Sequence, residues 1–174
     1  MGYILGIDQG GTKTAAAVMD EAGKILGIAT RRGAYYPTDG MASAFTKIKE
    51  AVEEAIAQAG ITREQIGTAI AGITGIDWQG DEEKVTEELK KILEISDLHA
   101  YNDAVIALYC VEEGEGDMVL CAGTGMNAAV RDGEESYFVF GDYIEESMQG
   151  EALWHAGPSA GCLMPRSDLD RIRS

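Results

Sequence analysis

A chain of 174 residues is long enough for one well-buried domain and too short for two domains of usual size. Hydrophobic residues make up 45% of the chain and charged residues 25%, which is the composition of an ordinary globular protein. The net charge of −16 disfavours nucleic acid and anionic membrane surfaces as partners, because both would repel so acidic a chain.

Cysteine usage and the absence of targeting signals predict a cytoplasmic protein. Cys110, Cys121 and Cys162 lack the paired spacing of metal sites and predict free thiols in a reducing compartment. No stretch has the length of a membrane span, and the first residues lack the charged and apolar regions of a signal peptide.

The first predicted element is a hairpin. An apolar run at residues 3–7 ends at Asp8, Gly10 and Gly11 turn the chain, and a second apolar run follows at residues 15–20. A carboxylate at the end of a strand could hold Mg²⁺ through water, since that ion dehydrates reluctantly. The hairpin therefore predicts a metal site at Asp8.

The turn of this hairpin has the chemistry of an anion site. Because Gly10 and Gly11 have no Cβ atom, backbone N–H groups can approach and bind an anion such as a phosphate. Thr12 and Thr14 add hydroxyl donors, and Lys13 could meet a phosphate, although alternation along its strand could turn it away. An ordinary glycine hairpin with capping hydroxyls is the alternative.

The next residues predict a third strand, a loop and a helix. Residues 25–30 form the strand, which completes a meander, and residues 33–40 are rich in turn formers. Apolar residues then recur at intervals of three and four from Ala44 to Ala59 and predict an amphipathic helix that ends at Gly60.

Shorter elements follow in alternation. Thr62 to Gln65 has the pattern of a capping box, and Asp81 could cap a helix whose apolar face begins at Val85. The remaining elements are strands at 68–71, 98–101, 117–122, 126–131 and 137–140, and helices at 104–110 and 145–155. This order predicts the α/β class.

A second glycine turn lies about one hundred residues after the first. The predicted strand at 117–122 leads into Gly123, Thr124 and Gly125, and the chain returns through Asn127. One such turn is common in hairpins, but two in one sheet could approach a phosphate chain from both sides.

Asn102 and Asp103 stand between a predicted strand and a predicted helix. The field of the helix N-terminus favours an ionised Asp103 by about 0.3–1 kcal/mol when the site is exposed. An ionised carboxylate there could accept the proton of an attacking hydroxyl. The alternative is that both residues only cap the helix.

The string Asp8-Gln9-Gly10-Gly11-Thr12-Lys13-Thr14 resembles the first phosphate loop of the actin-like ATPase superfamily. It is most similar to the branch of N-acetylglucosamine kinases and BadF/BadG/BcrA/BcrD ATPases. The resemblance covers roughly residues 1–155 and implies a ribonuclease-H-like lobe. That lobe has a mixed five-stranded central sheet flanked by helices, with an added small hairpin region. We expect residues 1–156 to form it, and residues 157–174 to be a tail or the start of a second lobe.

The resemblance implies that ATP and Mg²⁺ bind and that a sugar or amino-sugar hydroxyl accepts the phosphoryl group. Asp8 would serve the metal, and Asp103 would be the catalytic base. The residues implied at the phosphates are Gly10, Gly11, Thr12, Lys13, Thr14, Gly123, Thr124 and Gly125. Those implied at the acceptor are Thr124, Asn127 and Asp142.

Two segments depart from the kinase pattern. Similar kinases carry Gly-Asp-Glu-Gly-Ser where this chain has Gly141 and Asp142 followed by bulky residues. The loop after the third strand, where such kinases often place an Asn for the sugar, offers Tyr35, Tyr36 and Thr38 instead. Both departures weaken the expectation of a hexose.

Two other functions therefore stay open. In the BadF-like branch, ATP hydrolysis activates a partner such as a 2-hydroxyacyl-CoA dehydratase or benzoyl-CoA reductase, and cysteines bind an iron–sulfur cluster at a dimer interface. A single lobe could instead be a non-catalytic nucleotide-binding or scaffold domain, since the second lobe normally completes the nucleotide site. A homodimer, or a partner that supplies the second lobe, is compatible with these readings.

Overall fold

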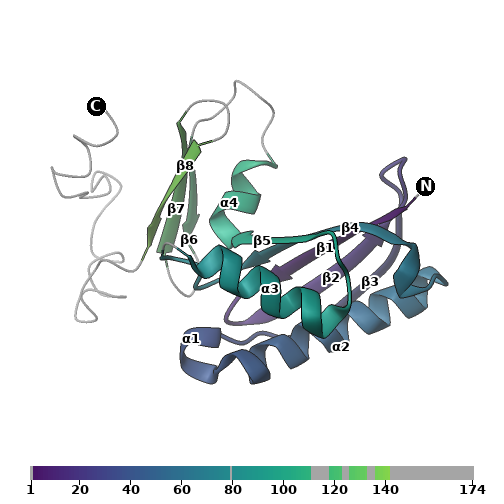
Figure 1. The fold of residues 1–174 in the computed structure, drawn as a ribbon. Coiled ribbons are helices and arrows are strands. Elements are labelled where there is room, and N and C mark those ends of the chain that lie inside the picture. The colour runs from purple at the N-terminus through teal and green to yellow at the C-terminus, as the bar shows by residue number, and fades with distance from the viewer. Residues whose placement is uncertain (1, 79, 111–117, 123–125, 133–135, 142–174) are drawn as a thin grey trace, which may run out of the picture.

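A computed structural model describes residues 2–78, 80–110, 118–122, 126–132 and 136–141 (Figure 1). Their strands and helices are β1 (Tyr3–Gln9), β2 (Lys13–Met19), β3 (Ile25–Arg32), α1 (Tyr36–Asp39), α2 (Met41–Ala59), β4 (Ile66–Ile73), α3 (Asp81–Leu93), β5 (Leu98–Asn102), α4 (Asp103–Leu108), β6 (Met118–Ala122), β7 (Met126–Asp132) and β8 (Ser136–Gly141). A 3-10 turn, Arg63–Gln65, joins α2 to β4. The predicted capping box is present there, with the Thr62 N–H donating to Gln65 Oε1 at 2.8 Å.

Strands β1 to β5 form one mixed sheet in the order β3-β2-β1-β4-β5 (Figure 1). The pairs β1–β2 and β2–β3 are antiparallel, because short turns join them. The pairs β1–β4 and β4–β5 are parallel, because helices connect them. The predicted α/β lobe with a mixed five-stranded central sheet is therefore confirmed.

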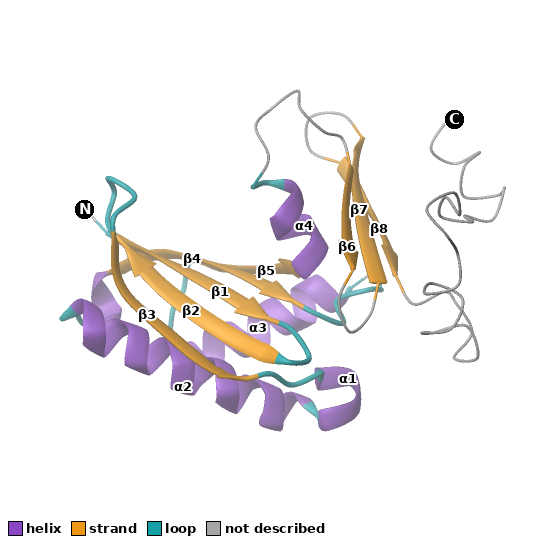
Figure 2. Ribbon diagram, turned by 180° about the vertical axis from the view of Figure 1, so that it is seen from behind, coloured by secondary structure: helices purple, strands orange, loops and turns teal. Residues whose placement is uncertain are grey.

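The two faces of this sheet have different neighbours. Alternation along β1 buries Leu5, Ile7 and Gln9 on one face and places Gly6 and Asp8 on the other. Helices α2 and α3 cover the first face, and α4 lies over the second (Figures 1 and 2). We call these the core face and the α4 face.

Apolar side chains from two helices fill the core face. The largest of those that α2 and α3 bury completely are Phe45, Ile48, Val52, Val85, Leu89 and Leu93. Burying one such side chain stabilises a fold by about 1.5–3 kcal/mol. Helix α2 also approaches β3 closely at Gly27, where an added Cβ would lie less than 3.0 Å from backbone atoms of Ala55 and Ala59.

The end of α2 agrees with the sequence prediction, and the start of α3 does not. Helix α2 ends at Gly60, whose φ of 68° is the left-handed conformation that closes many helices. Helix α3 is preceded by Gly80 at a φ of 91°, and Asp81 is its first residue. Asp81 therefore lies inside the helix and not at the cap position, so the prediction that Asp81 caps the helix is wrong. The Asp81 carboxylate accepts the Trp78 N–H at 3.3 Å.

The predicted loop at 33–40 contains a one-turn helix, α1, which the turn-forming residues did not reveal. Pro37 stands in its first turn, where a missing N–H costs no helical hydrogen bond. Tyr36 is buried against Phe45, with ring centroids 6.2 Å apart. This packing orders the segment.

A second sheet, in the order β6-β7-β8, packs against the far side of α4. Ala104, Val105 and Leu108 of α4 are buried together with Ala129 of β7. Asn102 caps this helix, since its Oδ1 accepts the Ala104 N–H at 2.9 Å. Helix α4 therefore lies between the two sheets.

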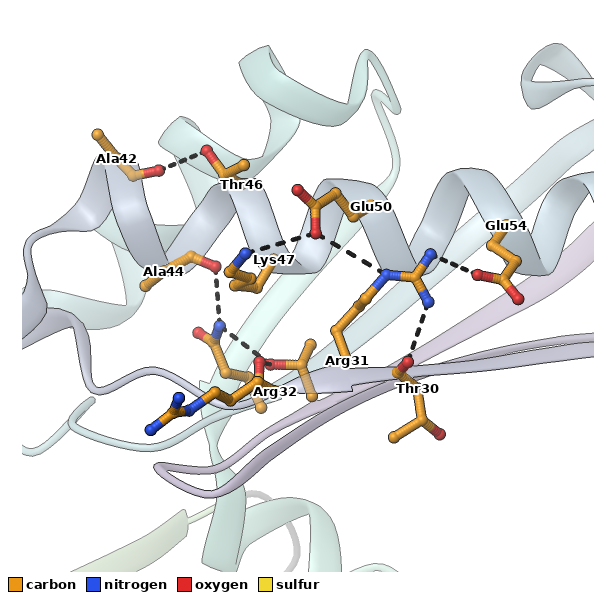
Figure 3. Close-up of polar contacts among 11 residues, drawn as sticks. Thr30, Arg31, Arg32, Ala42, Ala44, Thr46, Lys47, Glu50 and Glu54 are labelled. Atoms are coloured by element: carbon orange, nitrogen blue, oxygen red, sulfur yellow. Dashed lines mark hydrogen bonds and ion pairs between the residues drawn. The ribbon is translucent and has the colours of Figure 1, made fainter.

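Strand β3 is an edge of the large sheet, and side chains of α2 reach it. Arg31 forms ion pairs with Glu50, at 3.8 Å, and with Glu54 (Figure 3). Gln58 Oε1 accepts the Ile28 N–H at 3.1 Å. Arg32, the next residue along the strand, is exposed, and its guanidinium lies away from both glutamates (Figure 3).

Across residues 2–78 and 80–110, which hold all the described helices, none is both long and apolar enough to cross a membrane. The predicted helix at 145–155 and the segment 157–174 lie outside the described residues.

Candidate functional site

Two carboxylates lie near each other at the carboxyl ends of β1 and β5. Asp8 is exposed on the α4 face, where its neighbours on the adjoining strands are Ala15 and Gly72. Asp103 begins α4 and packs over Gly72, where an added Cβ would lie 3.4 Å from the Asp103 Cα and 3.0 Å from Ile106. Because Gly72 has no side chain, α4 can bring Asp103 towards Asp8.

The surroundings of Asp103 alter its acidity. Burial raises the pKa of Asp103 above that of an ordinary aspartate, and the charge of Asp8 adds to this shift. Hydrogen bonds from the Ala104 N–H, at 2.9 Å, and from Asn127 Nδ2, at 3.4 Å, lower the pKa by less. Burial thus outweighs the helix field that the sequence predicts to favour ionisation, and a carboxylate with a raised pKa is a stronger proton acceptor when ionised.

Hydrogen bonds of the Asn102 and Asn127 amide side chains connect the surroundings of Asp103 to the loop after β4. Asn102 is fully buried, and its Oδ1 accepts from Asn127 Nδ2 at 2.9 Å. Its Nδ2 donates to the Ile76 carbonyl and to Asp77 Oδ1, both at 3.0 Å. These bonds connect β5, β7 and the loop, and they fix the place of Asp103.

Asn127 lies at the centre of the candidate site, whereas the sequence predicts only that it contacts the acceptor. Its Nδ2 donates to both Asn102 and Asp103. Its Oδ1 is buried and accepts no hydrogen bond in the part of the chain that the structure describes. That oxygen is an acceptor without a donor, which is a costly state for a buried polar atom.

The first glycine turn is closed by a hydrogen bond of 2.8 Å from the Gly10 N–H to the Lys13 carbonyl. Neither Gly10 nor Gly11 has a left-handed φ, so the backbone conformation does not require glycine there. A Cβ on Gly11 would meet nothing within 4 Å. The glycines therefore keep the surface of the turn open, as the predicted approach of an anion requires.

The residues after the turn point to opposite faces. Lys13 is exposed and stands two residues before Ala15, the partner of Asp8, so it shares the α4 face. Thr14 is fully buried, and its hydroxyl donates to the Arg32 carbonyl at 3.5 Å and accepts from Gln9 Nε2 at 3.4 Å. A phosphate contact by the Thr14 hydroxyl stays a prediction and would need these bonds to open.

The second glycine turn, Gly123 to Gly125, and Asp142 lie outside the described residues. The strands beside the turn are described, and Cys121 of β6 pairs with Asn127 of β7. Burial raises the pKa of the Cys121 thiol, and the charge of Asp103 adds to it. The adjoining ends of β6 and β7 are therefore near Asp103.

The tyrosines after β3 differ in exposure. Tyr36 donates from its hydroxyl to the Gly75 carbonyl at 2.6 Å. Burial, together with the charges of Asp81 and Asp77, raises the pKa of Tyr36. Tyr36 is thus a packing residue, whereas Tyr35 is half-buried and Thr38 is exposed. Trp78 is 68% exposed and belongs to the loop after β4 that is hydrogen-bonded to Asn102.

The described residues contain no group of three or more His, Cys, Asp or Glu side chains that could hold a metal ion. Mg²⁺ does not need such a group, because it keeps several waters and uses one or two carboxylates with substrate phosphates. The exposed carboxylate of Asp8 beside an open turn fits an ion bound in that way.

The sequence predicts roles for Asp8, Asp103 and Asn127 but none for Asp77 or Gly72. Strand pairing could have indicated Gly72, since it stands near the carboxyl end of a buried parallel strand as Asp8 does. No sequence signal links Asp77 to Asn102, because their contact depends on how the loop after β4 folds back.

Solved structures with the same architecture define the class of protein. A candidate N-acetylglucosamine kinase from Chromobacterium violaceum superposes with a TM-score of 0.64 at 20% identity, over 84% of this chain and 51% of that one. A ROK family glucokinase from Streptomyces griseus, in complex with glucose and AMPPNP, gives 0.60 at 21% identity over 82% and 49%. A candidate N-acetylglucosamine kinase from Porphyromonas gingivalis gives 0.57 at 22% over 79% and 46%. The fold is therefore that of an actin-like ATPase lobe, as predicted, and the chain spans about half the length of these structures.

The family can be stated more closely. The model of the BadF/BadG/BcrA/BcrD ATPase family matches residues 5–156, and this chain belongs to that family. A comparison with curated protein sequences gives no match.

Proposed function

We propose that this chain is the phosphate-binding lobe of an ATP-dependent phosphotransferase resembling N-acetylglucosamine kinase. It would transfer a phosphoryl group from ATP to a hydroxyl of a sugar or amino sugar. The observation that carries the proposal is the placement of Asp103, which is half-buried, hydrogen-bonded to Asn127 and near Asp8. Membership of an ATPase family supports ATP as the ligand.

In this proposal the first turn binds phosphate oxygens. The backbone N–H groups of Gly11 and Thr12 and the Thr12 hydroxyl lie on the exposed turn, and the Lys13 ammonium is on the same face as Asp8. Asp8 would hold Mg²⁺ through water. When bound, that ion neutralises charge on the phosphates.

Asp103 would accept the proton from the acceptor hydroxyl as the hydroxyl oxygen attacks the γ-phosphorus of ATP. The bond from that phosphorus to the bridging oxygen would break, and ADP would leave. The Asn127 amide N–H holds the carboxylate in place. Asn127 Oδ1, which accepts no hydrogen bond from the described residues, could accept one from a hydroxyl of the same acceptor. Because phosphoryl transfer has a loose transition state, positioning contributes more than the base does.

Other parts of the proposal rest on the resemblance alone. Gly123, Thr124 and Gly125 would bind phosphates from the opposite side, and Thr124 and Asp142 would contact the acceptor. We place the lobe at residues 1–156, with residues 157–174 as a tail or the start of a second lobe. A second lobe on this chain or on a partner would complete the nucleotide site.

Titration calorimetry with AMPPNP and Mg²⁺ tests the nucleotide site. We expect Asp8→Asn to weaken Mg²⁺-dependent binding by about tenfold to a hundredfold, as loss of a charge-assisted interaction does. Glu21→Gln is the matched control, because it removes one negative charge from the opposite end of the sheet. Equal affinity in both variants would exclude Asp8 from the metal site.

Release of ADP in the presence of a panel of sugars and amino sugars tests the reaction. Asp103→Asn should lower turnover by about 10²- to 10⁴-fold, which is the usual contribution of a general base. Its affinity for AMPPNP should be unchanged or higher, since the variant removes a negative charge. Full activity in Asp103→Asn would remove this residue from the mechanism.

The family favours one alternative, in which ATP hydrolysis activates a partner enzyme. ADP release without stimulation by any sugar, together with iron bound to protein purified without oxygen, would support that function. Failure of MgATP at millimolar concentration to raise the melting temperature would instead support a non-catalytic scaffold domain.

A further inference from the structure

Gly33 follows β3 and lies directly beneath the first glycine turn. Its N–H donates to the Thr12 carbonyl at 2.8 Å. Thr12 is at the exposed end of the turn, whereas Gly33 is half-buried. The turn is therefore hydrogen-bonded to a residue about twenty positions further along the chain.

The space around Gly33 allows no side chain. A Cβ there would lie less than 3.0 Å from Gly10 O, Lys13 N and Thr12 C. All three atoms belong to the backbone, so they cannot move aside as the end of a flexible side chain can. The φ of Gly33 is outside the left-handed region, so close approach, and not conformation, accounts for glycine at this position.

Gly33 is itself held by the segment that follows it. Tyr36 is buried, packs on Phe45 and donates to the Gly75 carbonyl. A Cβ on Gly75 would lie 2.9 Å from both Pro37 and Tyr35, so this segment is fixed against the loop after β4 as well. The first glycine turn is thus hydrogen-bonded to Gly33, and the segment that follows Gly33 is packed against α2 and the loop after β4.

We propose that Gly33 is a positioning residue that holds the Gly10–Lys13 turn in the conformation that binds phosphate. The proposal rests on the proposed function for the identity of the anion, a nucleoside triphosphate. Any side chain at position 33 would displace the turn, and with it the backbone N–H groups that are proposed to bind phosphate.

Gly33→Ala in the full chain tests this role against two matched glycine variants. In Gly6→Ala, on β1, the new Cβ meets nothing within 4 Å. In Gly27→Ala it would lie less than 3.0 Å from backbone atoms of α2, so the crowding is comparable but distant from the turn. Three measurements are made on each protein: melting temperature, hydrogen exchange over residues 9–14, and affinity for AMPPNP with Mg²⁺.

We expect Gly33→Ala and Gly27→Ala both to lower the melting temperature. Only Gly33→Ala should speed exchange over residues 9–14 and weaken AMPPNP binding, each by about tenfold or more. Gly6→Ala should match the wild-type chain in exchange over residues 9–14 and in AMPPNP affinity. A purely structural role would lower the melting temperature of Gly33→Ala and leave its affinity equal to that of Gly27→Ala, which would overturn the proposal.

The two proposals fail in different ways. If the wild-type chain does not bind AMPPNP, the proposed function is contradicted, and exchange over residues 9–14 still decides whether Gly33 holds the turn. If Gly33→Ala does not fold, exchange is measured on the wild-type chain with and without AMPPNP. Protection of Gly33 together with Gly10 supports the proposal, and protection of Gly10 alone overturns it.

Discussion

The core face and the α4 face of the large sheet are built from alternate residues of the same strands. In β1, Leu5 and Ile7 are buried on the core face, while Asp8 is exposed on the α4 face. In β3, Arg31 reaches the glutamates of α2, and the adjacent Arg32 lies away from them (Figure 3). The core face thus pairs Arg31 with glutamates of α2 and packs apolar side chains, whereas the α4 face keeps charged groups exposed.

This difference separates stability from chemistry. The core face is filled by apolar side chains from α2 and α3, which stabilise the fold. On the α4 face, two carboxylates are near each other and one is half-buried, an arrangement that costs free energy in the absence of a cation. Substitutions on the two faces should therefore have effects of opposite sign.

The largest effect should come from the core face. Phe45 is fully buried, and Phe45→Ala should lower the free energy of unfolding by about 3–5 kcal/mol, through lost burial and the cavity left behind. Ile28, which is 55% exposed on β3, provides the control, and Ile28→Ala should cost less than about 1 kcal/mol. Urea unfolding of both variants measures the difference, and similar losses would contradict the division between the faces.

A smaller effect of opposite sign is expected on the α4 face. Because the pKa of Asp103 is raised in the folded state, protonated Asp103 contributes stability below about pH 4, and this contribution is lost as pH rises through the raised pKa. Asp103→Asn lacks this loss and keeps an oxygen that can accept from Ala104 and Asn127. Its melting temperature should exceed that of the wild-type chain near pH 7, and the gain should shrink near pH 4. A gain that does not change with pH would point to another cause.

The smallest effect compares the two arginines of β3. Arg31→Gln should lower the free energy of unfolding by about 0.5–1 kcal/mol, because it removes partly exposed ion pairs with Glu50 and Glu54. Arg32→Gln should change it by less than about 0.5 kcal/mol. Added salt at about 1 M should reduce the first effect, since it screens exposed charges. Equal losses in both variants would contradict the assignment of Arg31 to the core face.

Much of the fold could be predicted because local patterns determine it. The three- and four-residue spacing of apolar side chains indicates α2, and Gly60 ends it in the structure as in the prediction. Helix α1 could not be predicted from its own turn-forming residues, because it depends on the burial of Tyr36 against Phe45.

The candidate site could be predicted only in outline. Asp8 and Asp103 each follow a run of strand residues, and the carboxyl ends of β1, β4 and β5 meet at one edge of the sheet. The bonds of Asn127 to Asn102 and Asp103 span about 25 positions of the chain and join β7 to β5 and α4. No spacing rule yields such a contact, because it depends on how β7 packs against α4.

The hydrogen bond from the Ile28 N–H to Gln58 has a consequence for self-association. An unpaired edge of a sheet is a template on which a strand from another molecule can add. On β3 one of the donors that such a strand would need is already used by Gln58, and Arg31 is held to α2 nearby. Helix α2 therefore supplies the core and also occupies part of the edge on which a strand from another molecule would add.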